Sequence, residues 1–152
     1  MKNESEDFMI LVSACLAGIP CRYDGRSNLV PEIRQLVEEG KAVTVCPEVL
    51  GGLPTPRIPS ERLGDKVINR AGEDVTKAFL SGAEKALEIA REHGCETAVL
   101  KARSPSCGHG CIYNGSFNGT LVQGNGVAAQ LFLKYGIRIL TEEEFLSGKA
   151  SE

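Results

Sequence analysis

Three cysteines of this chain each follow a short apolar run of residues. The runs and their cysteines are residues 9–14 before Cys15, residues 42–45 before Cys46, and residues 97–100 upstream of Cys107. Short apolar runs of this kind are typical of parallel strands that are covered on both faces. The carboxyl ends of such strands meet at one edge of a sheet, so the three thiols could meet at one site. Thiolates select soft metals, chiefly zinc and the iron of iron–sulfur clusters.

The third cysteine lies in a stretch dense in reactive groups, Lys101-Ala-Arg-Ser-Pro-Ser-Cys-Gly-His-Gly-Cys111. Pro105, Gly108 and Gly110 make a regular helix or strand improbable there. A loop that follows a buried strand and carries such groups is where open α/β sheets place their sites. We therefore expect residues 101–111 to form the centre of a functional site.

Two further residues could supply acid–base chemistry beside a metal held by three cysteines. Three protein ligands around a centre that takes four leave an open position, which is typical of catalytic metal sites. Glu48 lies two residues after Cys46 and could act as a base on water, and Ser104, three residues before Cys107, could relay a proton. Burial would raise the pKa of the carboxyl group and a cationic neighbour would lower it. The sequence leaves open which of the two effects dominates.

The same cysteines also allow other readings. A zinc or structural metal module would close its shell with Cys21 or His109 as the fourth ligand. A thiol redox protein would pair Cys107 with Cys111, or Cys15 with Cys21. No Cys-x-x-Cys pair is present, which weakens both readings. A nucleotide-binding module without chemistry is a further alternative, but no Gly-x-Gly-x-x-Gly follows the first apolar run.

Strand and helix patterns alternate along the chain. The expected strands are residues 8–14, 42–46, 97–100 and 137–140, and the expected helices are residues 28–40, 74–93, 126–135 and 141–145. Asp74 is expected to cap the longest helix. Residues 47–72 are expected to be irregular, and residues 112–122 to form an irregular or hairpin excursion. The alternation predicts an α/β domain with a mostly parallel sheet and helices on both faces.

Length and composition limit the class of protein. The chain has 152 residues, of which 42% are hydrophobic and 24% charged, with a net charge of −3. These values predict a single soluble domain over residues 8–147, with flexible tails at 1–7 and 148–152. There is no basic excess, so extended nucleic-acid binding is not expected. No run approaches the length of a membrane span, and we expect the chain in the cytoplasm, where thiols stay reduced.

Several long motifs resemble the thiouracil desulfidase family, which was long catalogued as a domain of unknown function. They are Ser13-Ala-Cys15-Leu-Ala-Gly18, Cys21-Arg-Tyr-Asp-Gly25, Cys46-Pro-Glu-Val-Leu-Gly-Gly-Leu-Pro-Thr-Pro-Arg57, Asp74-Val-Thr76, Lys101-Ala-Arg-Ser-Pro-Ser-Cys-Gly108 and Gly119-Thr-Leu121. The similarity runs from Met9 to about Phe145.

The resemblance implies a single Rossmann-like domain that holds a [4Fe-4S] cluster on Cys15, Cys46 and Cys107. It implies that Glu48 is the catalytic acid–base group and that Ser104 assists it. It further implies removal of sulfur from a thiolated nucleobase such as 2-thiouracil, which gives the oxo base and hydrosulfide.

Overall fold

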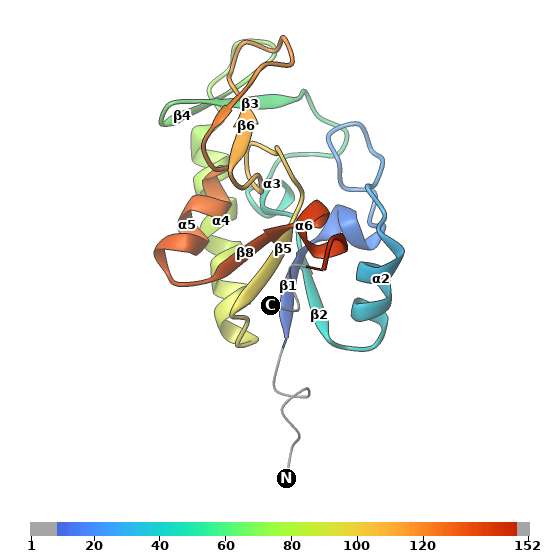
Figure 1. Cartoon of the computed structure of the whole chain (residues 1–152). Coiled ribbons are helices and arrows are strands. Elements are labelled where there is room, and N and C mark those ends of the chain that lie inside the picture. The colour runs from blue at the N-terminus through green and yellow to red at the C-terminus, as the bar shows by residue number, and fades with distance from the viewer. Residues whose placement is uncertain (1–8, 149–152) are drawn as a thin grey trace.

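A four-stranded parallel sheet forms the centre of the molecule. The computed structural model describes residues 9–148, so the expected tails lie outside the described residues except for Gly148. The sheet has the order β2-β1-β5-β8, and every neighbouring pair is parallel. Its strands are β1 Ile10–Ser13, β2 Ala42–Val45, β5 Thr97–Leu100 and β8 Arg138–Thr141. Figure 1 shows all four strands rising toward the same edge. The predicted parallel sheet is thereby confirmed.

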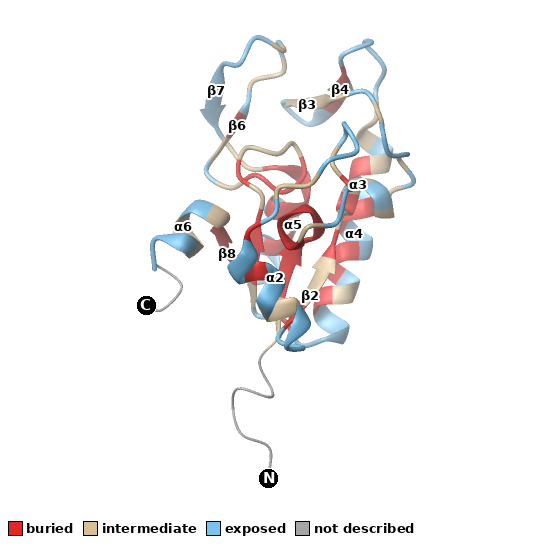
Figure 2. Cartoon of the chain, turned by 90° about the vertical axis from the view of Figure 1, so that its right-hand side faces the viewer, coloured by how far each residue is buried: buried red, intermediate tan, exposed pale blue. Residues whose placement is uncertain are grey.

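Helices cover both faces of this sheet. Successive strand residues point to opposite sides, and they divide into two buried cores. Leu11, Ala98 and Ile139 belong to one core and Val12, Val99 and Leu140 to the other. On the first face lie α4 (Thr76–Glu92) and α5 (Val127–Lys134), and on the second α2 (Pro31–Glu38), the 3-10 helix η1 (Ala14–Ala17) and α6 (Glu142–Leu146). Figure 2 shows the buried residues concentrated between these layers.

The helix boundaries follow from local chemistry, with one exception. Pro31 opens α2, as its fixed backbone angle favours. Thr141 and Glu144 form a reciprocal capping box at the start of α6. The predicted cap by Asp74 is wrong, because α4 begins at Thr76 after Val75, and the Asp74 carboxylate instead accepts the N–H of Thr76 at 2.9 Å. That bond forms a turn ahead of the helix.

Residues 47–72 are more regular than predicted. They contain the short helix α3 (Pro47–Leu50) and the antiparallel strands β3 (Ser60–Leu63) and β4 (Lys66–Asn69). The two strands are joined by a tight turn at Gly64, whose φ of 62° suits glycine. Because β3 lies half-buried to exposed, its sequence lacks the apolar alternation that identifies a strand.

Two glycines bring α3 close to α4. A Cβ on Gly82 would lie 1.7 Å from the carbonyl oxygen of Pro47, and a Cβ on Gly51 would lie 2.0 Å from the carbonyl oxygen of Ala78. No side chain can occupy such positions unless the backbones separate. This close approach fixes the segment that follows β2 against the longest helix.

Two hairpins form a second layer above the carboxyl edge of the sheet. One is β3–β4, and the other joins β6 (Cys111–Tyr113) to β7 (Leu121–Gln123), as the turn signals predict. The Glu61 carboxylate of β3 accepts the backbone N–H groups of Gly115 and Phe117, both at 3.0 Å. Figure 1 shows the two hairpins together over the sheet.

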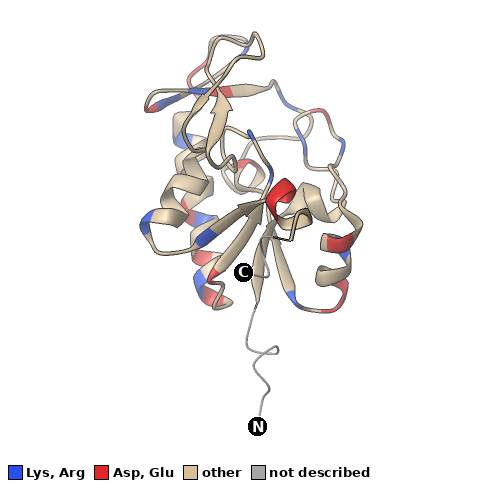
Figure 3. Cartoon of the chain, in the orientation of Figure 1, with Lys and Arg blue, Asp and Glu red and all other residues tan. Residues whose placement is uncertain are grey.

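The surface of the described chain carries both signs of charge. Figure 3 shows Lys and Arg interspersed with Asp and Glu on the helices and on the hairpins. Within residues 9–148, none of the helices combines the length and the apolar composition that crossing a bilayer requires.

Candidate metal centre and active site

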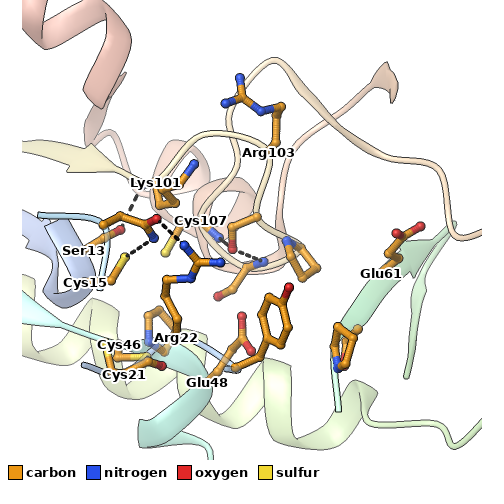
Figure 4. A pocket seen from close by; sticks show the side chains of 18 of the residues that line it. Ser13, Cys15, Cys21, Arg22, Cys46, Glu48, Glu61, Lys101, Arg103 and Cys107 are labelled. Carbon is orange, nitrogen blue, oxygen red and sulfur yellow. Dashed lines mark hydrogen bonds between the residues drawn. The ribbon is translucent and has the colours of Figure 1, made fainter. Parts of the chain in front are cut away.

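A cavity of about 510 Å³ lies at the carboxyl edge of the sheet. Its lining includes Cys15, Cys46 and Cys107, the three cysteines expected from the sequence, together with Glu48 and Ser104. Figure 4 shows the three thiols and Glu48 around this cavity. The structure therefore brings together all five residues that the sequence places in the site.

Each thiol reaches the cavity from a different strand end. Cys15 lies in η1, directly after β1, and Cys46 comes between β2 and α3. Cys107 lies in the irregular loop that follows β5, where the sequence predicts a loop. Cys15 and Cys107 are both buried, and Cys46 is half-buried. The parallel sheet thus gathers residues that are 31 and 61 positions apart in sequence.

Every one of these sulfurs has its own hydrogen-bond donor. The Asn28 amide donates to Cys15 Sγ at 3.4 Å, the Ser13 hydroxyl donates to Cys107, and the backbone N–H of Val49 donates to Cys46. Burial raises the pKa of Cys15 and of Cys107, and these donors oppose that rise. A donor at each sulfur favours the thiolate, which is the form that binds metal.

Cys46 is the most acidic of the three thiols. A hydrogen bond from the thiol of Cys21 is the main cause, and it lowers the pKa of Cys46 to about 7. The same contact raises the pKa of Cys21, which therefore stays protonated. Cys21 lines the cavity beside the predicted ligands.

Glu48 is held by an arginine. Arg57 Nε donates to Glu48 Oε1 at 2.9 Å, and the exposed fractions of the two side chains are only 7% for Arg57 and 17% for Glu48. The remaining guanidinium nitrogens donate to the carbonyl oxygens of Cys21 and Pro54, and to the Thr55 hydroxyl. Burial raises the pKa of Glu48, and the guanidinium of Arg57 opposes that rise, so both effects expected from the sequence act on this carboxyl group.

Ser104 turns the loop that carries Cys107. Its Oγ accepts the backbone N–H of Ser106 at 3.1 Å and that of Cys107 at 3.0 Å. Both bonds leave the hydroxyl hydrogen to be donated elsewhere, because an oxygen acceptor keeps its own O–H. The serine therefore shapes the turn and still presents a donor at the cavity that it lines.

A second ion pair fixes the start of this loop. Lys101 Nζ lies 3.1 Å from Glu142 of α6, and the same carboxylate accepts the N–H of Ala102 at 2.7 Å. The backbone N–H of Lys101 donates to the Ser13 hydroxyl at 3.0 Å. The ammonium of Lys101 lowers the pKa of Cys15, whereas the carboxylate of Glu142 raises it, so the two charges of the pair oppose each other at this thiol.

The two remaining cysteines lie outside the cavity. Cys95 follows α4 and lines a separate small cavity with Tyr135 and Ile137, and Cys111 begins β6. His109 lies 4.0 Å from Glu144 and does not line the cavity of the thiols. Among residues 9–148, no group of three or more His, Cys, Asp or Glu side chains is arranged to hold a single metal ion.

Several residues of this site are marked only weakly in the sequence. Arg57 and Arg22 are charged residues in loops, for which a surface position is an equally good reading, yet both line the cavity. Asn28 carries no signal at all, because its role depends on the fold of a loop that returns to Cys15. Such contacts appear only when the loops are placed in space.

Comparison with known proteins identifies the family. A sequence model described as 2-thiouracil desulfurase matches residues 10–144. The chain belongs to the 2-thiouracil desulfurase family. This confirms the resemblance found in the sequence.

Two relatives of this family member are informative. An uncharacterised protein of Bacillus subtilis (strain 168), YbbK, is 47% identical over 146 residues, which cover 90% of this chain and 97% of the relative. A solved structure described as the [4Fe-4S]-dependent thiouracil desulfidase TudS is 46% identical, with a TM-score of 0.87 over 92% of this chain and 94% of that one. The structural match confirms the predicted α/β class at the level of the whole fold.

The residues of this family member fit an iron–sulfur cluster. Iron–sulfur clusters are held by thiolates, and their properties depend on hydrogen bonds to the sulfurs. Here three thiols surround one cavity, and each has a hydrogen-bond donor of its own. Two cations lie near the predicted thiolates, Lys101 paired with Glu142 and Arg57 paired with Glu48.

Proposed function

We propose that this chain is an iron–sulfur-dependent desulfidase that removes sulfur from a small thiolated nucleobase such as 2-thiouracil. The observation that carries the proposal is the shared cavity, in which Glu48 and Ser104 lie with thiols from three separate strand ends. Family membership and the likeness to a [4Fe-4S]-dependent thiouracil desulfidase support it. The reaction consumes water and a thiocarbonyl, and gives a carbonyl and hydrogen sulfide without transfer of electrons.

Cys15, Cys46 and Cys107 are the residues proposed to hold the [4Fe-4S] cluster through their sulfurs. When bound, the cluster supplies a soft Lewis acid with an open position, which suits a thiocarbonyl sulfur. The donors at the three sulfurs favour the thiolate form that binds iron, and they oppose the burial that raises the pKa of Cys15 and Cys107.

Glu48 is proposed as the base that takes a proton from the attacking water. Arg57 fixes the carboxylate through Oε1, which leaves Oε2 for the water. A positioned general base typically contributes about 10²–10⁴-fold to the rate. Ser104 is proposed to donate its hydroxyl hydrogen to the substrate, because its oxygen already accepts two backbone N–H groups.

The alternative readings are weaker. A zinc module or a thiol redox protein would explain the cysteines, but neither is favoured by the family or by the likeness to TudS. We further propose a small base rather than a polynucleotide as the partner, because the chain carries a net charge of −3 and the site is a cavity. Six cysteines outside any disulfide suit the reducing cytoplasm.

The test is hydrosulfide release by the protein after anaerobic reconstitution. The wild-type protein should bind about four irons, the content of a [4Fe-4S] cluster, and release hydrosulfide from 2-thiouracil or another thiolated pyrimidine. Glu48→Gln should keep the iron and lose about 10²–10⁴-fold in hydrosulfide release.

A matched control is Glu38→Gln, which changes an exposed carboxylate of α2. It should release hydrosulfide at the wild-type rate. Turnover near wild type in Glu48→Gln would remove Glu48 from the mechanism. A reconstituted wild-type protein that holds iron but desulfurates no thiolated pyrimidine would refute the proposed function.

A further inference from the structure

Asn28, in the loop that precedes α2, contacts a predicted cluster ligand. Its Nδ2 lies 3.4 Å from Cys15 Sγ, and its backbone N–H donates to the carbonyl oxygen of Cys15 at 2.9 Å. The side chain is half-buried and lines the cavity. Asn28 therefore holds Cys15 at both its backbone and its sulfur.

The orientation of this amide is determined by Arg22. Arg22 NH1 donates to Asn28 Oδ1 at 2.9 Å. A guanidinium can only donate, so the atom that faces it must be the amide oxygen. The NH₂ group of Asn28 must then face Cys15 Sγ, where it is a donor.

Asp24 in turn orients Arg22. Arg22 NH2 lies 3.0 Å from Asp24 Oδ2, and Asp24 Oδ1 accepts the backbone N–H of Arg26 at 3.0 Å. The result is a chain of hydrogen bonds, Asp24–Arg22–Asn28–Cys15, in which each group fixes the next. The chain ends at a sulfur of the proposed metal centre.

We propose that Asn28 is a positioning residue that donates a hydrogen bond to the Cys15 thiolate of the bound cluster, and that Arg22 fixes its donor group toward the sulfur. The inference rests on the proposed function, because it takes Cys15 to be a ligand. Hydrogen bonds to the sulfurs tune the reduction potential of iron–sulfur clusters. Partners of metal ligands also strengthen metal binding, typically by 10- to 100-fold.

The direction of each effect follows from electrostatics. Reduction adds negative charge to the cluster and its sulfurs, and an N–H donor stabilises that charge. Removing the donor should therefore lower the reduction potential and weaken iron retention. A hydrogen-bond acceptor in place of the Asn28 donor should lower the reduction potential and the iron retention further, because two electron-rich atoms would face each other.

The test compares Asn28→Leu and Asn28→Asp with the wild-type holoprotein. Asn28→Leu removes the donor, and Asn28→Asp keeps the size and the bond to Arg22 but presents an oxygen to the sulfur. Both should lower the midpoint potential measured by EPR-monitored titration, Asn28→Asp more than Asn28→Leu. Both should lose iron to a chelator about 10- to 100-fold faster than wild type.

Asn118→Asp is the matched control, since it adds the same charge in the turn between β6 and β7, where the side-chain oxygen accepts the N–H of Thr120. Its potential and iron loss should equal those of wild type. Thermal unfolding of each variant separates local effects from loss of the fold. Wild-type potential and iron retention in Asn28→Leu would overturn the inference, whereas a wild-type protein that holds no cluster would overturn the proposed function instead.

The role of Arg22 is tested by a double-mutant cycle. If Arg22 acts through Asn28, Arg22→Ala should shift the potential less in the Asn28→Leu background than in wild type, because coupled residues are not additive. Equal shifts in both backgrounds would show that Arg22 acts through its charge alone and would refute its positioning role.

Discussion

Six cysteines of the chain fall into two groups with different surroundings. Cys15, Cys46 and Cys107 line one cavity, have donors at their sulfurs, and are joined there by Cys21. Cys95 and Cys111 lie outside that cavity, and burial raises the pKa of Cys95 to about 11, so this thiol stays neutral at physiological pH. Position relative to the cavity, rather than burial alone, separates the three proposed ligands from Cys95 and Cys111.

Replacement of a proposed ligand should abolish cluster retention. Cys15→Ser, Cys46→Ser and Cys107→Ser each leave two thiolates, which hold a cluster poorly, so iron and acid-labile sulfide should fall to background after anaerobic reconstitution. Cys95→Ser and Cys111→Ser are the matched controls and should keep wild-type iron content. Iron loss in Cys111→Ser together with retention in Cys107→Ser would show that the wrong cysteine of that loop has been assigned.

Some residues of the site can be predicted from the sequence and others cannot. The predictable ones have reactive side chains and follow apolar runs that indicate strands; they are Cys15, Cys46, Glu48 and Cys107. Arg57 and Asn28 act only through contacts with residues 9 and 13 positions away across loops. A loop conformation of that kind is set by many weak contacts, which no local pattern encodes.

At the level of elements, the site depends on how α3 meets α4. Cys46 immediately precedes α3, and Glu48 lies in its first turn. The carbonyl oxygen of Pro47 faces Gly82 of α4 with room for no side chain. The sequence of residues 47–72 predicts an irregular segment because α3 is too short, and β3 too exposed, to show a periodic pattern of apolar residues.

Gly82→Ala should destabilise the protein, against the usual preference of helices for alanine. In an open helix this change stabilises by roughly 0.5–1 kcal/mol. Here the added Cβ would lie 1.7 Å from the Pro47 oxygen, so α3 must move, and overpacking of this kind costs about 1–3 kcal/mol or more. Denaturant unfolding of the variant should show a lower free energy of unfolding, and iron content should fall because Cys46 is displaced.

Glu84→Ala, an exposed position on the same helix, is the control for this change. It should leave both the free energy of unfolding and the iron content near wild type. A Gly82→Ala protein more stable than wild type would show that α3 and α4 do not pack as closely as described.

The described chain has two layers with the cavity between them. The sheet layer is the parallel sheet with its helices, and it supplies the thiols. The hairpin layer is β3–β4 and β6–β7 with their connecting loops, and it contributes Glu61, Arg70, Tyr113 and Phe117 to the lining. The hairpins are joined by the two N–H bonds to Glu61 and by Arg70, whose guanidinium lies 5.5 Å from the centre of the Phe117 ring. Arg62 NH1 also donates to the carbonyl oxygen of Asn125 at 2.7 Å. This division predicts that the two layers can be perturbed separately.

Glu61→Ala should impair substrate binding without loss of iron. It removes the acceptor for the backbone N–H groups of Gly115 and Phe117, so the loop that carries Phe117 over the cavity loses its anchor. A hydrogen bond to a charged group contributes about 1.5–3 kcal/mol, so KM for a thiolated pyrimidine should rise by about tenfold or more. Because the proposed ligands belong to the sheet layer, iron content should stay at the wild-type value.

Glu73→Ala provides the comparison within the same layer. Its carboxylate accepts the side-chain N–H of Asn69 at 2.9 Å at the end of β4, so the change alters that hairpin without touching the link to residues 115–117. KM should then change much less than in Glu61→Ala. Loss of iron in Glu61→Ala would show that the hairpin layer also supports the metal centre, and an unchanged KM would show that Phe117 and its loop do not contact the substrate.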